Sequence, residues 1–254
     1  MNKPWALLIT ALLLPAAVLR ADPATEAMAR REQPRGALAW FKQGVALAER
    51  GEYRAALNRY HRARQLAPRW ALPHLEIAVA HLMTDNDRER IGRSLAKAVE
   101  LGSEIPRAHY LYGVYLHEQG ERERARAEFI RALQLRPSLL DARYRLATLY
   151  VEAGRQAAGI EQYELVLQQQ PSHIGARRNL ALLYERCGQI EQAEQQLRAV
   201  VRLDPDNPWQ LTRLARFYER NGFAAKARQT RRRAERIEPT GRRRKLRPLL
   251  KSRD

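Results

Sequence analysis

Apolar residues recur through most of the chain at spacings of three, four and seven, the spacing of one face of an α-helix. In residues 37–70 the large residues that follow this spacing are Trp40, Leu47, Tyr53 and Tyr60. Residues 174–207 repeat the pattern with Leu180, Tyr184, Ile190 and Leu197. The pattern predicts a series of short amphipathic helices, each with one apolar stripe.

Residues that end helices recur in step with these stripes. The glycines are Gly51, Gly120, Gly154, Gly188 and Gly222, of which the last four are 34 residues apart. The prolines in the same register are Pro68, Pro137, Pro171, Pro205 and Pro239. Glycine adopts a positive φ at little cost and proline cannot continue a helix, so each one marks a helix end. The sequence therefore predicts six two-helix units, at 37–70, 71–105, 106–139, 140–173, 174–207 and 208–241.

Small residues occupy two further positions of the unit, where helix backbones can approach closely. At position 8 they are Gly44, Ala78, Gly113, Ala147, Ala181 and Ala215, and at position 20 they are Ala56, Ala125, Gly159, Ala193 and Ala227. The second unit departs most from the pattern: it has Asp85 in place of glycine, Ser103 in place of proline, and one extra residue around 84–90. We expect two helices there with a looser turn between them.

This pattern resembles the tetratricopeptide repeat family. The resemblance is best seen in Ala-Leu-Ala-Trp-Phe-Lys-Gln-Gly from Ala37, Gly-Glu-Tyr-Arg-Ala-Ala from Gly51, and Tyr-His-Arg-Ala from Tyr60, and it extends over residues 37–241. It implies an all-α, right-handed superhelical solenoid of six repeats, in which stacked units share one core and the first helices line a concave groove.

In that family the groove is lined by unit positions 2, 5, 9, 12 and 13. Here the candidate groove residues are Phe41, Leu75, Val79, Tyr110, Val114, His117, Tyr144, Thr148, Arg178, Leu182, Arg186, Arg216 and Arg220. The set runs from apolar through aromatic to mainly arginine. We expect it to bind a peptide or helix of a protein partner that has apolar and acidic parts. Two alternatives stay open: residues 22–36 cover the apolar end, or the apolar end is a dimer contact.

Some relatives clamp a peptide carboxylate with Lys and Asn on successive first helices. Asn179 and Arg213 fit such a clamp, but Tyr144, Thr148 and Trp209 occupy the other clamp positions. We therefore do not expect a carboxylate clamp of that kind.

The charge is lopsided, with 46 basic against 28 acidic residues and a net charge of +18. Residues 220–254 alone hold 14 Lys and Arg against three acids. The candidate residues for an anionic partner in the tail 242–254 are Arg242, Arg243, Arg244, Lys245 and Arg247. An anionic membrane surface suits them, and a tail that only aids solubility is the alternative. Nucleic acid is less favoured, since the tail has no aromatic residues for base stacking.

The N-terminus predicts export. Lys3 precedes an apolar stretch at residues 6–19, and Ala21 and Ala24 offer small residues for cleavage. Fourteen residues are short for a hydrocarbon core of about 30 Å. We expect a signal peptide at 1–21, a linker or short cap at 22–36, and a periplasmic or secreted protein, with an uncleaved anchor as the alternative.

No motif for catalysis, a cofactor or a metal is present. The single cysteine, Cys187, has no partner in the chain for a disulfide. His74 and His81 lie seven residues apart without the HExxH spacing of a zinc site. The sequence therefore indicates a non-enzymatic adaptor. By resemblance to exported repeat proteins, it would serve assembly of a bacterial envelope complex such as pilus, secretion or motility machinery. The rival is a membrane-tethered or cytoplasmic regulator that binds anionic lipid or nucleic acid through its Arg-rich end.

Overall fold

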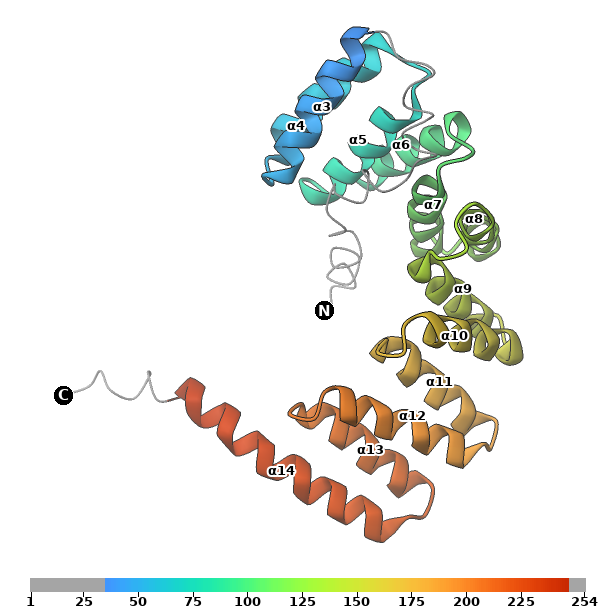
Figure 1. Ribbon diagram of the computed structural model, residues 1–254, viewed down its shortest axis with the longest axis vertical. Helices are drawn as coiled ribbons and strands as arrows, with labels where there is room; N and C mark the ends of the chain where they lie inside the picture. The colour runs from blue at the N-terminus through green and yellow to red at the C-terminus, as the bar shows by residue number, and fades with distance from the viewer. Residues whose placement is uncertain (1–34, 247–254) are drawn as a thin grey trace, which may run out of the picture. The chain divides into compact units, whose positions relative to one another are not determined.

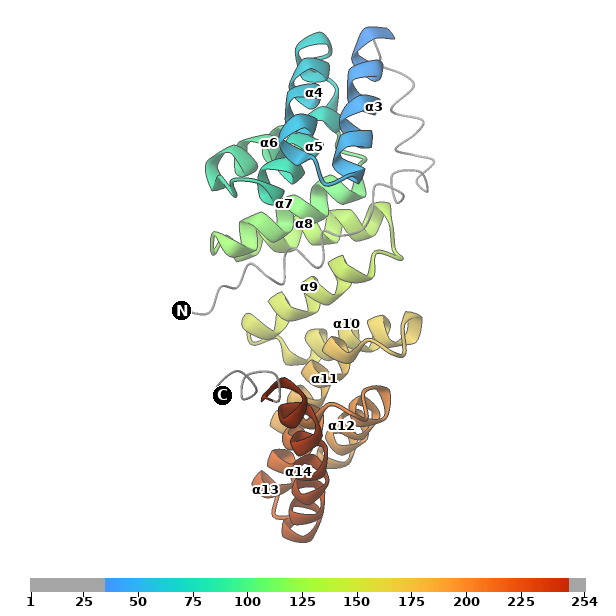
Figure 2. The same ribbon diagram turned by 90° about the vertical axis from the view of Figure 1, so that its left-hand side faces the viewer.

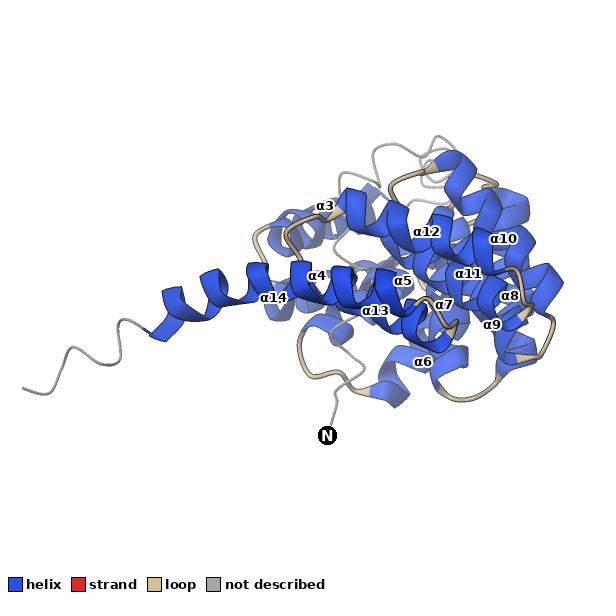
Figure 3. Cartoon of the chain, turned by 90° about the horizontal axis from the view of Figure 1, so that it is seen from below, coloured by secondary structure: helices blue, strands red, loops and turns tan. Residues whose placement is uncertain are grey.

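The structure is a computed structural model that describes residues 35–246, and side chains within 36–237. The described part consists of twelve α-helices, with no strand between residues 35 and 246 (Figure 1, Figure 3). The helices are α3 (Arg35–Glu49), α4 (Tyr53–Leu66), α5 (Ala71–Met83), α6 (Arg88–Leu101), α7 (Pro106–Glu118), α8 (Arg122–Leu135), α9 (Leu140–Glu152), α10 (Gln156–Gln169), α11 (Ile174–Arg186), α12 (Ile190–Leu203), α13 (Pro208–Arg220) and α14 (Ala224–Leu246). The all-α repeat fold predicted from the sequence is confirmed.

Successive helices form antiparallel pairs, and the pairs follow the period of the sequence. Helices α5, α7, α9, α11 and α13 begin at residues 71, 106, 140, 174 and 208, which are the first residues of the corresponding units. In both ribbon views α3 lies beside α4 (Figure 1, Figure 2). The chain divides into two compact units, residues 1–146 and 147–254, which are described separately below.

The turn inside most pairs is closed by glycine. Gly51, Gly120, Gly154, Gly188 and Gly222 have φ between 73° and 83°. At Gly188 the N–H donates to the Glu185 carbonyl at 3.1 Å, and the next N–H, of Gln189, donates to the Tyr184 carbonyl at 2.8 Å. This pair of bonds satisfies helix-end carbonyls, as in a Schellman motif. A Cβ on any of the five would meet nothing within 4 Å, so backbone conformation, not space, selects glycine.

In the second helix pair, asparagine takes the place of glycine in the turn. Asn86 has φ of 52°, and its N–H donates to the His81 carbonyl at 2.8 Å. Asparagine tolerates this left-handed conformation better than most residues. Asp87 then caps α6 by accepting from the Arg90 N–H at 3.1 Å. The two expected helices are present, and the turn between them is one residue longer than the turns closed by glycine and is held by these hydrogen bonds.

Small residues let the helices of a pair touch. A Cβ on Gly44 would lie 2.6 Å from the ring of Tyr60, and one on Gly113 would lie 2.8 Å from the ring of Phe129. Both rings are fully buried. The aromatic side chain of one helix therefore lies directly on the backbone of its neighbour.

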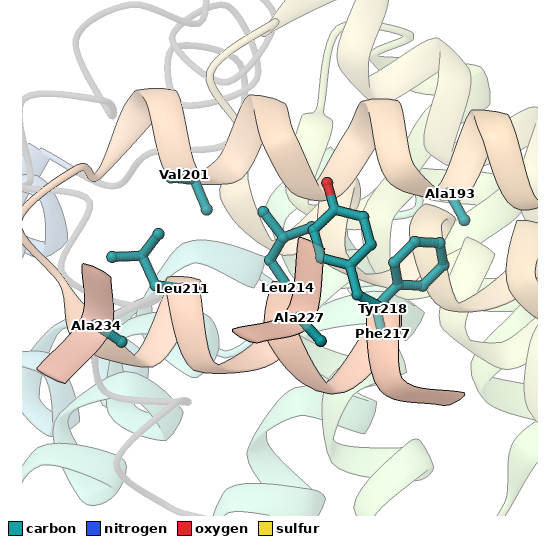
Figure 4. Packing of buried hydrophobic residues seen from close by; sticks show 8 residues of the cluster. All are labelled: Ala193, Val201, Leu211, Leu214, Phe217, Tyr218, Ala227 and Ala234. Carbon is teal, nitrogen blue, oxygen red and sulfur yellow. The ribbon is translucent and has the colours of Figure 1, made fainter. Parts of the chain in front are cut away.

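The second compact unit has a core built from α12, α13 and α14. Its members are Ala193, Val201, Leu211, Leu214, Phe217, Tyr218, Ala227 and Ala234 (Figure 4). In Figure 4 the side chains of α13 lie between the small residues of the two flanking helices. Burial of this apolar face leaves the polar face of α13 for other contacts.

The last helix is longer than the sequence predicts. Pro239 was expected to end it, yet α14 continues to Leu246. A proline inside a helix removes one backbone hydrogen bond and crowds the preceding turn. At the other repeat prolines the next helix begins within a few residues. Of the five repeat prolines, Pro239 is therefore the one that the structure places inside a helix.

Two sequence predictions fall outside the described residues. The signal peptide at 1–21 and nearly all of the linker at 22–36 belong to this group. Between residues 35 and 246, no helix combines the length and the apolar character needed to cross a membrane.

The turn chemistry can be tested at Gly188. Gly188→Ala should lower the free energy of unfolding by about 1–2 kcal/mol, because an L-residue at φ 73° is strained. Urea denaturation followed by circular dichroism measures the loss. Gln189→Ala is the matched control, since Gln189 has φ of −85° and makes no side-chain cap bond. Equal stability of the two variants would contradict the account.

Candidate functional site

The clearest candidate site is an arginine-rich groove in the second compact unit. It has a volume of about 470 Å³ and is lined by residues of α11 and α13 and by Leu197 of α12. Its basic members are Arg178, Arg186, Arg213, Arg216 and Arg220, and its one carboxylate is Glu185. Asn179, Ala181 and Leu182 complete the lining. We call this set the arginine groove.

The helical period places these residues on one side of each helix. On α13, Arg213, Arg216 and Arg220 follow at spacings of three and four, while Leu214 and Phe217 point into the core and are buried. On α11, Leu180 and Leu183 are buried in the same way, next to the groove residues Arg178 and Leu182. Packing of the apolar faces therefore fixes where the guanidinium groups lie.

One arginine of the groove is neutralised by the carboxylate. Arg220 donates from Nε to Glu185 Oε1 at 2.9 Å and from a terminal nitrogen to Oε2 at 2.8 Å. Asn221 adds a bond to Oε1 at 2.9 Å. The hydrogen bonds from Arg220, more than any other contact, lower the pKa of Glu185. Glu185 is thus held ionised and fully occupied by its neighbours.

The other four arginines have no such compensation. Among the described residues, Arg178, Arg186, Arg213 and Arg216 form no ion pair. The Arg178 Nε is buried and makes no hydrogen bond. Burial lowers the pKa of Arg213, and the charges of Arg178 and Arg216 lower it further. One guanidinium nitrogen is therefore unsatisfied and the four positive charges are close together, which favours an anionic ligand that accepts their hydrogen bonds.

Apolar side chains accompany the arginines. Leu182 is 46% exposed within the groove, and Trp209, one turn before Arg213 on α13, is 71% exposed. Large exposed apolar side chains next to arginine are typical of protein-binding surfaces. The arrangement suits a ligand that has both acidic and apolar groups.

The structure brings together five of the thirteen candidate groove residues. Arg178, Leu182, Arg186, Arg216 and Arg220 all line the arginine groove. His117, Tyr144 and Thr148 are half-buried and lie elsewhere. Thr148 is hydrogen-bonded to the Tyr163 hydroxyl at 2.9 Å, which identifies it as part of an internal polar contact.

The other five candidates are buried. Phe41, Leu75, Val79, Tyr110 and Val114 are at most 9% exposed. The Phe41 ring lies 4.7 Å from that of Trp70 and 5.6 Å from that of Tyr60. Helix α5 is buried at every position from Ala71 to His81. In this structure these side chains are core residues and do not line an open groove, and a ligand for them remains a prediction.

The candidate set lacks five groove residues: Ala181, Glu185 and Leu197, and the two nitrogen-bearing residues Asn179 and Arg213. Both occupy position 6 of their units, next to the family's groove position 5, and were considered only for a carboxylate clamp. The candidate tail residues could not be placed. Side chains of Arg242, Arg243, Arg244 and Lys245 are outside the described set, and Arg247 lies beyond α14.

Metal-binding groups and reactive side chains are the other kinds of site to consider in the described residues. Between residues 36 and 237, no three His, Cys, Asp or Glu side chains are arranged to hold a metal ion. Cys187 is exposed, and its thiol donates to Gln156 Oε1 at 3.3 Å. The arginine groove is the site with the clearest ligand chemistry in this unit.

Comparison with known proteins agrees with the fold. Models of the tetratricopeptide repeat match residues 91–139, 118–174 and 156–210. No curated protein sequence matches. Similar solved structures include PilF of Pseudomonas aeruginosa, at 21% identity and a TM-score of 0.66 over 81% of this chain and 93% of that one.

Two further structures resemble the chain. PilW is described as a widely conserved type IV pilus biogenesis factor, with 17% identity and a TM-score of 0.64 over 78% of this chain and 91% of that one. YrrB is described as having an unusual peptide-binding site, with 22% identity and a TM-score of 0.60 over 71% of this chain and 92% of that one. At these identities the likeness concerns the fold.

The groove's internal ion pair yields a prediction about titration. In wild type the pKa of Glu185 should lie below its usual value, and Arg220→Gln should raise it, because the hydrogen bonds that favour the carboxylate are lost. Any stability that this pair contributes is present at neutral pH and disappears as pH falls through the lowered pKa. Carbon-13 NMR titration of the Glu185 carboxyl measures the shift. An unchanged pKa in the variant would show that Arg220 does not hold the carboxylate in solution.

Proposed function

We propose that this chain, a tetratricopeptide-repeat protein, is an exported adaptor whose arginine groove holds a segment of a protein partner during assembly of a bacterial envelope complex. A protein-interaction scaffold is what the repeat fold provides. The segment has acidic side chains for the guanidinium groups and apolar side chains for Leu182. The observation that carries the proposal is that four arginines, which form no ion pair among the described residues, surround the exposed Leu182.

The chemistry of the groove favours this partner over a neutral peptide. Arginine pairs carboxylates through two parallel hydrogen bonds, and such charge-assisted bonds contribute about 1.5–3 kcal/mol each. Arg178 lies on α11, and Arg213 and Arg216 lie on the neighbouring α13. A segment with two or more acids could therefore contact both helices at once. Exposed Leu182 would contact an apolar side chain between those acids.

The envelope setting rests on two separate indications. The apolar stretch at residues 6–19 behind Lys3 suits export. The similarity to PilF and PilW, of which PilW is described as a pilus biogenesis factor, makes pilus assembly the first setting to examine. Secretion and motility machinery are further settings for the same adaptor.

The rival function has its own support in α14. Arg228, Arg232 and Arg236 follow at intervals of four along this helix, and among the described residues they form no ion pair. An anionic lipid surface or nucleic acid would meet such a stripe favourably. Compartment distinguishes the adaptor from a cytoplasmic rival that binds nucleic acid, because an exported protein does not meet the genome.

The groove is tested by removing two of its charges. Arg178→Gln with Arg216→Gln should weaken binding of a fluorescent peptide of alternating Leu and Glu by about tenfold or more, since two charge-assisted contacts are lost. Fluorescence anisotropy measures the affinity. The control, Arg155→Gln with Arg202→Gln, removes the same net charge from exposed positions outside the groove. Equal losses of affinity in the two double variants would show that the peptide responds to the net charge of the protein and not to the arginine groove.

Export is tested by fractionation. Full-length protein should be recovered from the periplasm or the membrane, whereas a chain lacking residues 1–21 should remain in the cytoplasm. Immunoblotting of fractions, with a cytoplasmic enzyme as marker, measures the distribution. A cytoplasmic full-length protein would reject the adaptor's envelope role and favour the rival function.

A further inference from the structure

A second pocket, in the first compact unit, has a lining that the adaptor function does not use. It has a volume of about 500 Å³ and lies between α4, α5 and α6. Seven of its lining side chains are basic: His61, His74, His81, Arg64, Arg90, Arg93 and Lys97. Its lining includes no carboxylate. Basic side chains from three helices thus face one small volume.

His74 and His81 each use one ring nitrogen in a hydrogen bond, so protonation of the other nitrogen would add a hydrogen-bond donor. His74 Nε2 lies 3.2 Å from the Pro68 carbonyl, and His81 Nδ1 lies 3.1 Å from Asp85 Oδ1. Both oxygens only accept hydrogen bonds, so these ring nitrogens are the donors. The second nitrogen of each ring has a lone pair in the neutral form and becomes a donor on protonation. The His61 ring is 6.5 Å from the His81 ring. Protonation would therefore add several donors to the same pocket.

Four permanent cations line the pocket beside the histidines, and three of them pair with acids that lie outside the lining. Arg64 forms no ion pair among the described residues. Arg90 contacts Asp87 at 3.0 Å and Asp85 at 4.0 Å. The other two pairs are Arg93 with Glu89 at 3.5 Å and Lys97 with Glu100 at 2.6 Å. These acids lie outside the pocket lining, and such surface pairs contribute little stability, so the cations remain available to a ligand.

The potential inside the pocket is positive. Burial lowers the pKa of His61, and Arg64, His81, Arg90 and His74 lower it further. Burial also lowers the pKa of His74; Arg64 and Lys97 act in the same direction, while the Pro68 carbonyl and Glu100 oppose it. A bound anion would offset the unfavourable field, and the histidines would then hold their protons at higher pH.

We propose that this pocket binds an oxyanion of the phosphate class, and that its histidines take up protons when the anion binds. Arg64 supplies a permanent charge and the histidines supply a conditional one. Binding therefore strengthens as pH falls through the histidine range and levels off once the free histidines are protonated. The source of the phosphate group is either a soluble ligand or a lipid headgroup.

Sulfate is the probe for the pH dependence, because it stays doubly charged throughout the histidine range. Calorimetry on the full chain should show sulfate binding that is about tenfold tighter near pH 5.5 than near pH 7.5. NMR titration should show that sulfate raises the pKa of His61 or His74. Affinity that does not change with pH, together with unshifted histidines, would overturn the proposal.

A matched pair of variants locates the site. Arg64→Gln should weaken sulfate binding about tenfold, whereas Arg62→Gln should leave it unchanged. Arg62 lies on the same helix, is exposed, is bonded to Gln65 at 3.0 Å and does not line the pocket. Equal affinities of the two variants would overturn the assignment. Neither change touches the arginine groove, so failure here would leave the adaptor function standing.

Competition at constant pH identifies the source of the phosphate group. Displacement of sulfate by inorganic phosphate, and not by vesicles containing phosphatidic acid, would indicate a soluble ligand. Displacement by those vesicles as well, and not by vesicles of phosphatidylcholine alone, would indicate a lipid headgroup. Displacement by neither would overturn the proposal.

Discussion

This structure depends on close contacts in which a large aromatic side chain packs directly on a glycine of the neighbouring helix. The rings of Tyr60 and Phe129 lie on Gly44 and Gly113, at distances that a Cβ would not permit. Interiors are packed densely enough that such a contact has few alternatives. It fixes the rotation of each helix in its pair, and thereby decides which side chains face the core. The functional surfaces of the protein are what this packing leaves over.

The arginine groove follows from that division of faces. Leu214 and Phe217 commit one side of α13 to the core, so Arg213 and Arg216 must lie on the other side. The same rule on α11 places Arg178 opposite Leu180. Like charges held close together raise the free energy of the folded chain. Glu185 relieves part of that repulsion by pairing with Arg220, solvent and salt screen a further part, and an anionic ligand would relieve more of it. An unfavourable term in the free protein thus becomes a favourable one on binding.

Much of the fold could be predicted from the sequence because glycine and proline report the backbone directly. The position of a residue in the repeat unit predicts the helix ends well, but it predicts less well whether the side chain lines an open surface. Leu75 and Val79 have the spacing of a groove face, yet α5 is buried at every position from Ala71 to His81, and periodicity does not show which apolar stripe another part of the protein covers. Arg213 was missed because it is at unit position 6, one residue after a groove position of the family. Consecutive residues of a helix point about 100° apart, so a residue at position 6 is not expected to face the same groove. Asn86 could not be foreseen as a turn residue, since the extra residue shifts the register.

The two cationic sites differ in how their charge responds to the surroundings. Guanidinium groups stay protonated at any physiological pH, so the arginine groove is permanently ready for an acidic segment. The pocket between α4, α5 and α6 combines four permanent cations with three histidines, so part of its charge depends on pH and on the ligand itself. Residue type alone thus separates a constant protein-binding surface from a conditional anion site. The first site would therefore hold an acidic segment at any physiological pH, whatever the protonation state of the second.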